Sequence, residues 1–148
     1  MGSPFHALHH ICIVVHDISR AVENYESIGI GPWRDYPALT EYTTLSVPNR
    51  DAFFAMKYKV TDLDNVQLQL CEPPALDCPQ RRFLDSRGEG VYHVGFETDI
   101  ALADAAATQR GLTVTARGQR TNGSGFLYFD TSDIASVVLV ARKSPPSS

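Results

Sequence analysis

The stretches LHHICIVVHDI at residues 8–18 and VYHVGFETDI at residues 91–100 share one design. Each places a histidine, His10 or His93, in a short run rich in β-branched and aromatic residues, and each closes on Asp-Ile. An aspartate directly before a helical segment is a favoured N-cap, so each stretch predicts a strand followed by a helix. The repetition indicates an internal duplication of the chain.

The same order of elements follows each stretch. Apolar spacing predicts one helix over residues 19–28 and another over residues 100–110, and a glycine follows each. β-rich runs predict strands over residues 8–15, 42–47, 53–60, 66–71, 92–97, 112–117, 126–130 and 136–142. Module one then spans about residues 8–72, a Pro-rich connector with a short helix spans 73–90, module two spans about 91–142, and 143–148 form a mobile tail.

This order predicts an α+β fold. Two βαβββ modules are expected to form an open barrel-like, mostly antiparallel eight-stranded sheet around a central cavity, with the helices outside. A chain of 148 residues, 43% of them hydrophobic, can form one such domain.

The composition excludes several classes of function. The net charge is −4 and the 13 Lys and Arg residues are scattered, which argues against nucleic acid as a partner. No apolar run approaches the ~20 residues that cross a bilayer, and the first residues lack a signal-peptide pattern, so we expect a cytoplasmic protein without a membrane partner. The three cysteines have no CxxC spacing, which argues against a thiolate zinc site.

Strand alternation predicts which side chains face the cavity. His10 and Cys12 share one face of the first strand, Gln67 and Gln69 share one face of the fourth, and His93 and Glu97 point the same way from the fifth. Buried imidazoles and amides need partners, and a divalent metal would bind His10, Gln69 and His93 together. Ordinary hydrogen bonds are the alternative. His9 has the opposite parity and is expected at a strand edge.

Five phrases, HHICIVVHDISRAVENY, GIGPW, VQLQLCEP, FLDSRGEGVYHVGFETDI and GFLYFDT, resemble the vicinal oxygen chelate superfamily. This group includes glyoxalases, bleomycin resistance proteins and extradiol dioxygenases, and the phrases are most similar to its methylmalonyl-CoA epimerase-like branch. The resemblance implies a homodimer and a divalent metal held by His, Gln or Glu, His and Glu. By motif position, the first three ligands fall on His10, Gln69 and His93. Zn, Co, Ni, Mn and Fe are not distinguished.

The fourth ligand departs from the family pattern. Its position aligns with Leu139, and no Asp or Glu follows Asp133. A metal-free site is therefore the alternative to a three-ligand site. The last strand is expected to turn Val137 and Leu139 inward as apolar contacts for a ligand, together with Cys12 and Gln67 from the other strands.

The resemblance also implies proton transfer by carboxylates beside a thioester carbonyl, a role that leucine cannot fill. The remaining acid or base candidates are Glu41, Glu97 and Tyr128. The alternatives are a solvated charge for Glu41 and a solvated or salt-bridged charge for Glu97. The alternation of FLYFD leaves open whether Tyr128 or its neighbours face the cavity.

Two functions remain. The first is an isomerase or lyase that rearranges a small carbonyl-containing substrate through an enol-like intermediate. The second is a metal-free protein that binds or sequesters an apolar small molecule. The retained His-Gln-His set favours the enzyme, whereas Leu139 favours the binding protein.

Overall fold

The two histidine stretches form the centre of one sheet in the computed structural model, which describes residues 3–146. Strand β1 (Leu8–Val14) carries His10 and runs antiparallel to β6 (Gly90–Glu97), which carries His93. The other strands are β2 (Arg34–Asp35), β3 (Tyr42–Ser46), β4 (Lys57–Asp62), β5 (Gln67–Glu72), β7 (Val114–Arg120), β8 (Gly125–Phe129) and β9 (Val138–Lys143). The helices are α1 (Ile18–Ser27), η1 (Leu39–Glu41), α2 (Arg50–Ala55), α3 (Pro79–Arg87), α4 (Ile100–Gln109) and α5 (Ser132–Ala135).

The duplication is visible in the strand order. Within residues 3–146 the sheet has nine strands in the order β2-β4-β5-β1-β6-β9-β8-β7-β3. Reading outward from the centre, β1-β5-β4-β2 matches β6-β9-β8-β7, and β3 is an additional strand beside β7. The sheet is mixed because β1 pairs with β5, and β6 with β9, in parallel. The expected eight-stranded sheet is corrected to nine strands, and it is not closed into a barrel.

The region between β3 and β4 differs from its prediction. Residues 53–55 were expected in a strand, but they belong to α2. Asn49 begins this helix, because its side chain accepts a hydrogen bond from the Ala52 backbone N–H. The apolar sequence AFFA is therefore helical, and the strand starts only at Lys57.

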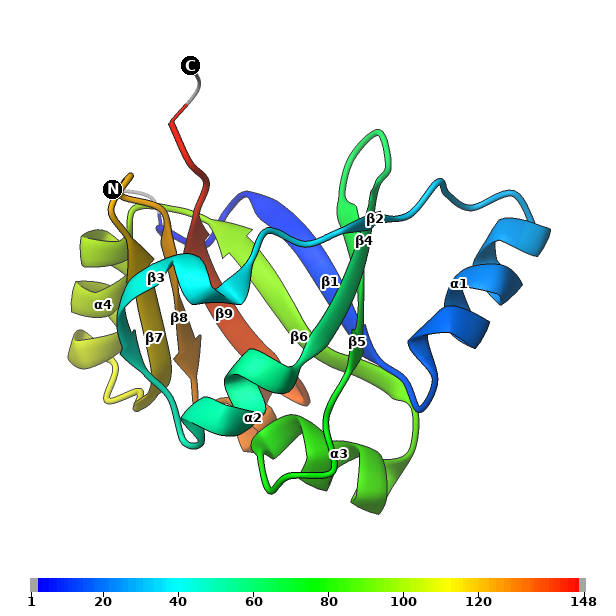
Figure 1. Cartoon of the computed structure of the whole chain (residues 1–148). Helices are drawn as coiled ribbons and strands as arrows, with labels where there is room; N and C mark the ends of the chain where they lie inside the picture. The colour runs from blue at the N-terminus through cyan, green and yellow to red at the C-terminus, as the bar shows by residue number, and fades with distance from the viewer. Residues whose placement is uncertain (1–2, 147–148) are drawn as a thin grey trace.

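Helices α1 and α4 lie at opposite ends of the molecule, each against the outer side of its half of the sheet (Figure 1). Asp17 and Asp99 cap them by accepting hydrogen bonds from the third residue along. Under α1 the core contains Val15, Ile18 and Leu70, and under α4 it contains Ala103, Ala107, Leu127, Phe129 and Ala141. The opposite side of the sheet is left for the cavities, near which α2 and α3 pack.

Strand β9 has the opposite side-chain parity from the prediction. Leu139 packs in the core under α4, so its expected place in the cavity is wrong. Val138 and Val140 face the cavity side instead. The chain enters β9 through Ser136, which has a left-handed φ of 65°, and the buried Thr131 hydroxyl donates to the Val137 carbonyl and accepts from the Leu139 N–H. These contacts set the register of a run whose sequence does not alternate.

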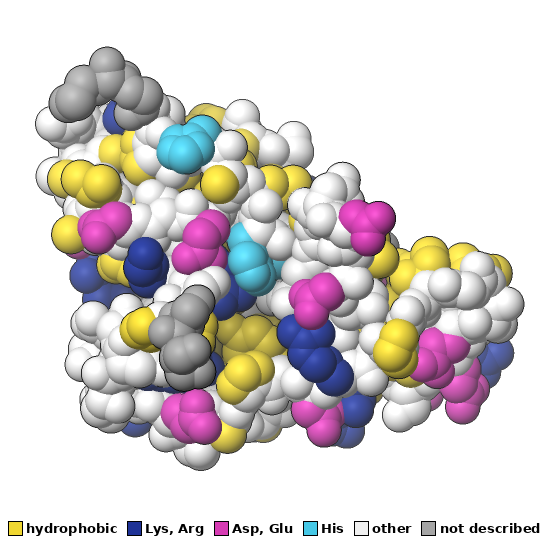
Figure 2. All heavy atoms as spheres, turned by 90° about the horizontal axis from the view of Figure 1, so that it is seen from above, with side chains coloured by type: hydrophobic (Ala, Val, Ile, Leu, Met, Phe, Trp, Pro, Cys, Tyr) yellow, Lys and Arg dark blue, Asp and Glu magenta, His cyan; other side chains and the backbone are white. Residues whose placement is uncertain are grey.

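The surface carries mixed charge. Figure 2 shows acidic and basic side chains intermingled on one face, with histidine side chains among them. No helix in the described residues is both long and apolar enough to span a bilayer. Lys143 ends β9 and Ser144 hydrogen-bonds to Glu97, so the ordered chain extends past the predicted start of the tail; residues 147–148 lie outside the described part.

Candidate functional site

His10, Gln69 and His93 line one small cavity of about 40 Å³, named here the histidine cavity. Each side chain is at most 4% exposed. The Nε2 atoms of His10 and His93 lie 3.0 Å apart. Gly95 on β6 makes room for this arrangement, since a Cβ there would lie 2.1 Å from Cε1 of His10. The other lining residues are Tyr36, Leu39, Tyr42, Phe53, Tyr58, Arg120, Gly125, Phe126, Tyr128, Val140, Arg142 and Lys143.

Burial keeps the imidazoles neutral. Desolvation lowers the pKa of His93 to about 3, and desolvation together with the neighbouring His93 lowers the pKa of His10 well below its usual range. The Nδ1 atom of His93 is buried and has no hydrogen-bond partner. A neutral imidazole with an unused nitrogen is suited to bind a metal, whereas burial makes it a weak base.

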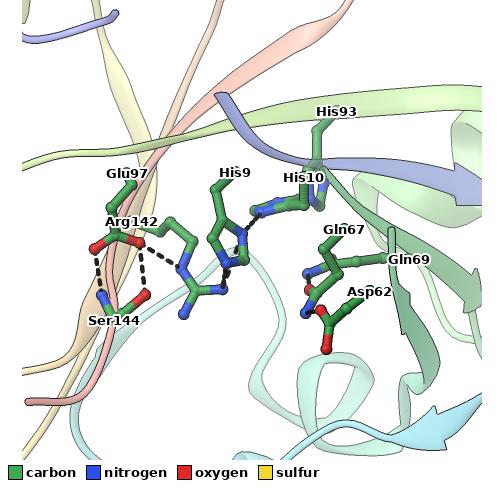
Figure 3. A network of polar contacts seen from close by, with 9 residues as sticks. All are labelled: His9, His10, Asp62, Gln67, Gln69, His93, Glu97, Arg142 and Ser144. Carbon is green, nitrogen blue, oxygen red and sulfur yellow. Dashed lines mark hydrogen bonds and ion pairs between the residues drawn. The ribbon is translucent and has the colours of Figure 1, made fainter. Parts of the chain in front are cut away.

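His9 and Arg142 form a polar network with His10 (Figure 3). The Nδ1 atoms of His9 and His10 lie 2.9 Å apart, and Arg142 Nη1 lies 3.1 Å from the ring nitrogens of His9. Burial, followed by the Arg142 charge, lowers the pKa of His9 to about 4. The expected edge position of His9 is wrong, because β1 has a register shift between Leu8 and His10 that strand alternation does not foresee.

Glu97 holds this network in place and lies outside the histidine cavity. Its carboxylate accepts hydrogen bonds from the Ser144 N–H and Oγ–H, and Oε1 lies 3.6 Å from Arg142 Nε. These contacts occupy the carboxylate, so the prediction of Glu97 as a proton-transfer residue is not supported by its position.

A chain of amides orients Gln69 (Figure 3). The Asp62 carboxylate can only accept, so Gln67 donates Nε2–H to it at 2.9 Å. Gln67 then offers its oxygen, which accepts from Gln69 Nε2–H at 2.8 Å. The carbonyl oxygen of Gln69 remains available as an acceptor or metal ligand. Gln67, expected to touch a substrate, instead positions Gln69 and lines neither of the two cavities described here.

The described lining of the histidine cavity contains no carboxylate. Gln69 pairs with Cys12, two residues after His10, and Val140 pairs with Gly95, two residues after His93. Val140, not Leu139, is therefore the residue of the second repeat that is equivalent to Gln69, and it occupies the position of the fourth metal ligand. Glu41 lies outside with 58% of its side chain exposed, and Cys12 is buried in the core away from both cavities.

The donor set fits a divalent metal by type and spacing. Two nitrogen ligands about 2.0–2.1 Å from one ion lie about 3 Å apart, which is close to the Nε2–Nε2 distance. Gln69 adds an amide oxygen. All three donors are neutral, and in the described residues no three His, Cys, Asp or Glu side chains form a metal-binding group. The fit is thus to a three-donor site without an anionic ligand.

Phe53, Phe126 and Tyr128 separate the histidine cavity from a larger one of about 370 Å³, named here the apolar cavity. Tyr128 shares the inward face with Phe126, which resolves the alternation left open by the sequence. Its ring centroid is 5.1 Å from that of His93, and burial raises the pKa of its phenol. Val137 lines the apolar cavity rather than the histidine cavity, from the position just before β9.

Two arginines of the histidine cavity were not predicted from the sequence. Arg120 and Arg142 both line the histidine cavity. Strand alternation could have found Arg120, because Ala116 and Gly118 precede it on the same face. Arg142 was hidden by the wrong parity of β9.

Comparisons with known proteins relate the chain to one superfamily. The model of the glyoxalase/bleomycin resistance protein/dioxygenase superfamily matches residues 9–129. Methylmalonyl-CoA epimerase from Mycobacterium tuberculosis is similar in structure, with a TM-score of 0.73 and 19% identity over 99% of this chain and 93% of that one. A variant of the Streptomyces coelicolor epimerase in complex with 2-nitronate-propionyl-CoA has a TM-score of 0.65 and 26% identity over 95% and 98%. No curated protein sequence matches significantly.

Proposed function

Because the chain belongs to the glyoxalase/bleomycin resistance protein/dioxygenase superfamily, we propose that it is an isomerase acting on a small carbonyl compound. The observation that carries the proposal is the pair of neutral imidazoles, His10 and His93, whose Nε2 atoms lie 3.0 Å apart beside Gln69 in a buried cavity. The structural similarity to methylmalonyl-CoA epimerases supports an enzyme that moves a proton next to a carbonyl group.

His10, Gln69 and His93 are the residues that would hold a divalent metal. A bound metal would supply Lewis-acid polarisation of a carbonyl oxygen. His9 and Arg142 would fix the orientation of His10, and Asp62 with Gln67 would fix that of Gln69.

Proton transfer requires an acceptor and a stabiliser of negative charge. Without a metal, His10 Nδ1–H donates to His9 Nδ1 and His93 Nε2–H donates to His10 Nε2, which leaves the lone pair of His93 on Nδ1. A proton from the carbon beside the carbonyl passes to this nitrogen, and the electron pair of the broken C–H bond forms the enolate. Because burial alone makes His93 a weak base, this step requires the enolate charge to form beside the imidazolium and stabilise it. The raised pKa of Tyr128 keeps its phenol protonated, so it can donate to the enolate oxygen. The enolate must turn over in the cavity before the proton returns, and return of the proton to the opposite face then gives the epimer.

The apolar cavity favours a second function, sequestration of an apolar small molecule. Its volume of about 370 Å³ suits such a ligand, and its walls include Phe53, Met56, Phe83 and Phe126. Val140 in the fourth-ligand position is consistent with a protein that needs no metal.

Deuterium exchange distinguishes the two functions. The protein is incubated in D₂O with a panel of enolisable thioesters and carboxylic acid derivatives, and deuterium at the α-carbon is followed by NMR. We expect the wild-type protein to exchange the α-proton and His93→Gln to slow this exchange at least 100-fold. His16→Gln, at an exposed histidine, is the control and should leave the exchange rate unchanged. Absence of exchange across the panel, together with tight binding of an apolar ligand, would support sequestration instead.

Metal analysis of untagged protein tests the cofactor separately. Bound metal that His10→Ala and His93→Ala both remove supports the metal site, and wild-type protein without metal supports the metal-free scheme. The expected homodimer is part of the proposal, and sedimentation analysis tests it.

A further inference from the structure

We propose that Arg120 forms a carboxylate-binding subsite in the histidine cavity, so that the ligand carries a carboxylate group besides the group that meets His10 and His93. The inference rests on the proposed function in that it concerns the same cavity, and it names the chemical class of the ligand. It depends on three features of the described residues: a buried guanidinium with two nitrogen atoms that have no hydrogen-bond partner, the charge of the cavity wall, and the size of the chamber.

Arg120 is the last residue of β7, and its side chain is 9% exposed. Its Nε and Nη2 atoms are buried and have no hydrogen-bond partner. A buried cation without hydrogen-bond acceptors is costly, because it gives up its hydration without replacement. The guanidinium carbon lies 4.0 Å from the centre of the Tyr42 ring, which positions the group but offers no acceptor in the plane of its N–H bonds.

One carboxylate lies near Arg120 but does not satisfy it. Glu41 Oε2 is 3.5 Å from Arg120 Nε, and 58% of the Glu41 side chain is exposed. An ion pair at this exposure is weak because water screens it. Nη2 therefore remains free to donate to a ligand.

The local sequence places Arg120 inside the fold. Along β7 the buried residues alternate as Ala116, Gly118 and Arg120, whereas Arg117 faces outward. Gly118 is required by space, since a Cβ there would lie 2.5 Å from the Phe126 ring. The strand thus keeps the wall beside Arg120 small and leaves its long side chain to reach the cavity.

The charge of the wall favours an anion. The lining includes Arg120, Arg142 and Lys143 but no Asp or Glu among the described residues, although the chain as a whole has a net charge of −4. Arg142 is already engaged by Glu97 and His9. Arg120 is consequently the cation best placed to receive an external anion.

The geometry favours a carboxylate over a larger anion. A guanidinium presents parallel N–H bonds that match the two oxygens of a carboxylate. The chamber holds about 40 Å³, which favours a compact carboxylate over a bulkier anion. The apolar cavity beyond Phe53 and Phe126 is then available for the rest of the molecule.

Calorimetry with malonate tests the subsite, with malonamide as the neutral probe of similar shape. We expect wild-type protein to bind malonate more tightly than malonamide. Arg120→Gln should weaken malonate binding about ten- to hundredfold and abolish this preference, while Arg120→Lys should recover part of it. The matched control is Arg117→Gln, on the outer face of the same strand, which should bind malonate like the wild type.

A second variant tests the free guanidinium without replacing it. Glu41→Gln removes the competing exposed carboxylate and should tighten malonate binding about two- to fivefold. Equal malonate binding by wild type and Arg120→Gln, or no binding by the wild type, overturns the subsite whatever the enzyme activity. If malonate binding depends on Arg120 but no deuterium exchange occurs, the subsite stands and the proposed isomerase falls.

Discussion

Gly95 is the residue on which the geometry of the histidine pair depends most directly. It pairs with His10 across β1 and β6, and an added Cβ would lie 2.1 Å from Cε1, 2.5 Å from Nε2 and 2.6 Å from Nδ1 of that ring. In Gly95→Ala the imidazole must therefore retreat by roughly 1.3 Å to reach an ordinary contact of 3.4 Å. His10 is 4% exposed and lies between His9 and His93, so its ring can move only by breaking these contacts and entering the histidine cavity.

We expect Gly95→Ala to lower the free energy of unfolding by about 1–3 kcal/mol, the usual cost of overpacking a core. It should also break the His10–His93 contact. Urea unfolding measures the first effect, and imidazole NMR shifts of the two histidines measure the second.

Gly90→Ala is the matched control on the same strand, because a Cβ there meets nothing within 4 Å. The control should change the free energy of unfolding by less than about 0.5 kcal/mol. Gly95→Ala with control-like stability and unchanged histidine shifts would refute the reasoning, because it would mean that the ring of His10 does not lie over Gly95.

Three further predictions follow from the site. Val140→Glu should raise Zn²⁺ affinity at least tenfold by calorimetry, because it adds a carboxylate on the cavity side, whereas Leu139→Glu should give no gain and lower the free energy of unfolding by about 1–3 kcal/mol. In chelator-treated protein, His93 has a pKa of about 3 in the folded state and 6.5 in the unfolded state. Its contribution to the free energy of unfolding is therefore fully present above pH 6.5 and is lost as the pH falls toward 3. Urea unfolding between pH 7 and 4 should show this loss, and His93→Gln should reduce it. Asp62→Asn should weaken Zn²⁺ binding about tenfold, because an amide at this position can donate as well as accept and no longer keeps the Gln69 oxygen free. Arg34→Gln removes only the ion pair of Asp62 and should leave Zn²⁺ binding unchanged.

The predictions from sequence succeeded where a polar residue marks the inner face of a strand. Gln69 and His93 stand between apolar neighbours and His10 begins an apolar run, so alternation assigned all three to the cavity side, where the structure places them. The paired Asp-Ile phrases likewise predicted both long helices, because an aspartate cap fixes where a helix begins.

The predictions failed where the sequence has no such mark. The run VVLVA in β9 is apolar at every position, so its face is decided by Thr131 and the turn at Ser136, which are tertiary and backbone features. The register shift beside His9 and the helical form of residues 50–55 arise in the same way, from local backbone geometry that overrides strand pattern.

Strand β3 gives the duplication an unexpected outcome. It is encoded in the first repeat, yet its hydrogen bonds go to β7 of the second. If the chain were cut in the connector after Glu72, β3 of the first fragment would lose its hydrogen bonds to β7. In the second fragment β7 would become an exposed edge strand. Each half of the duplicated chain thus completes its strand pairing through the other.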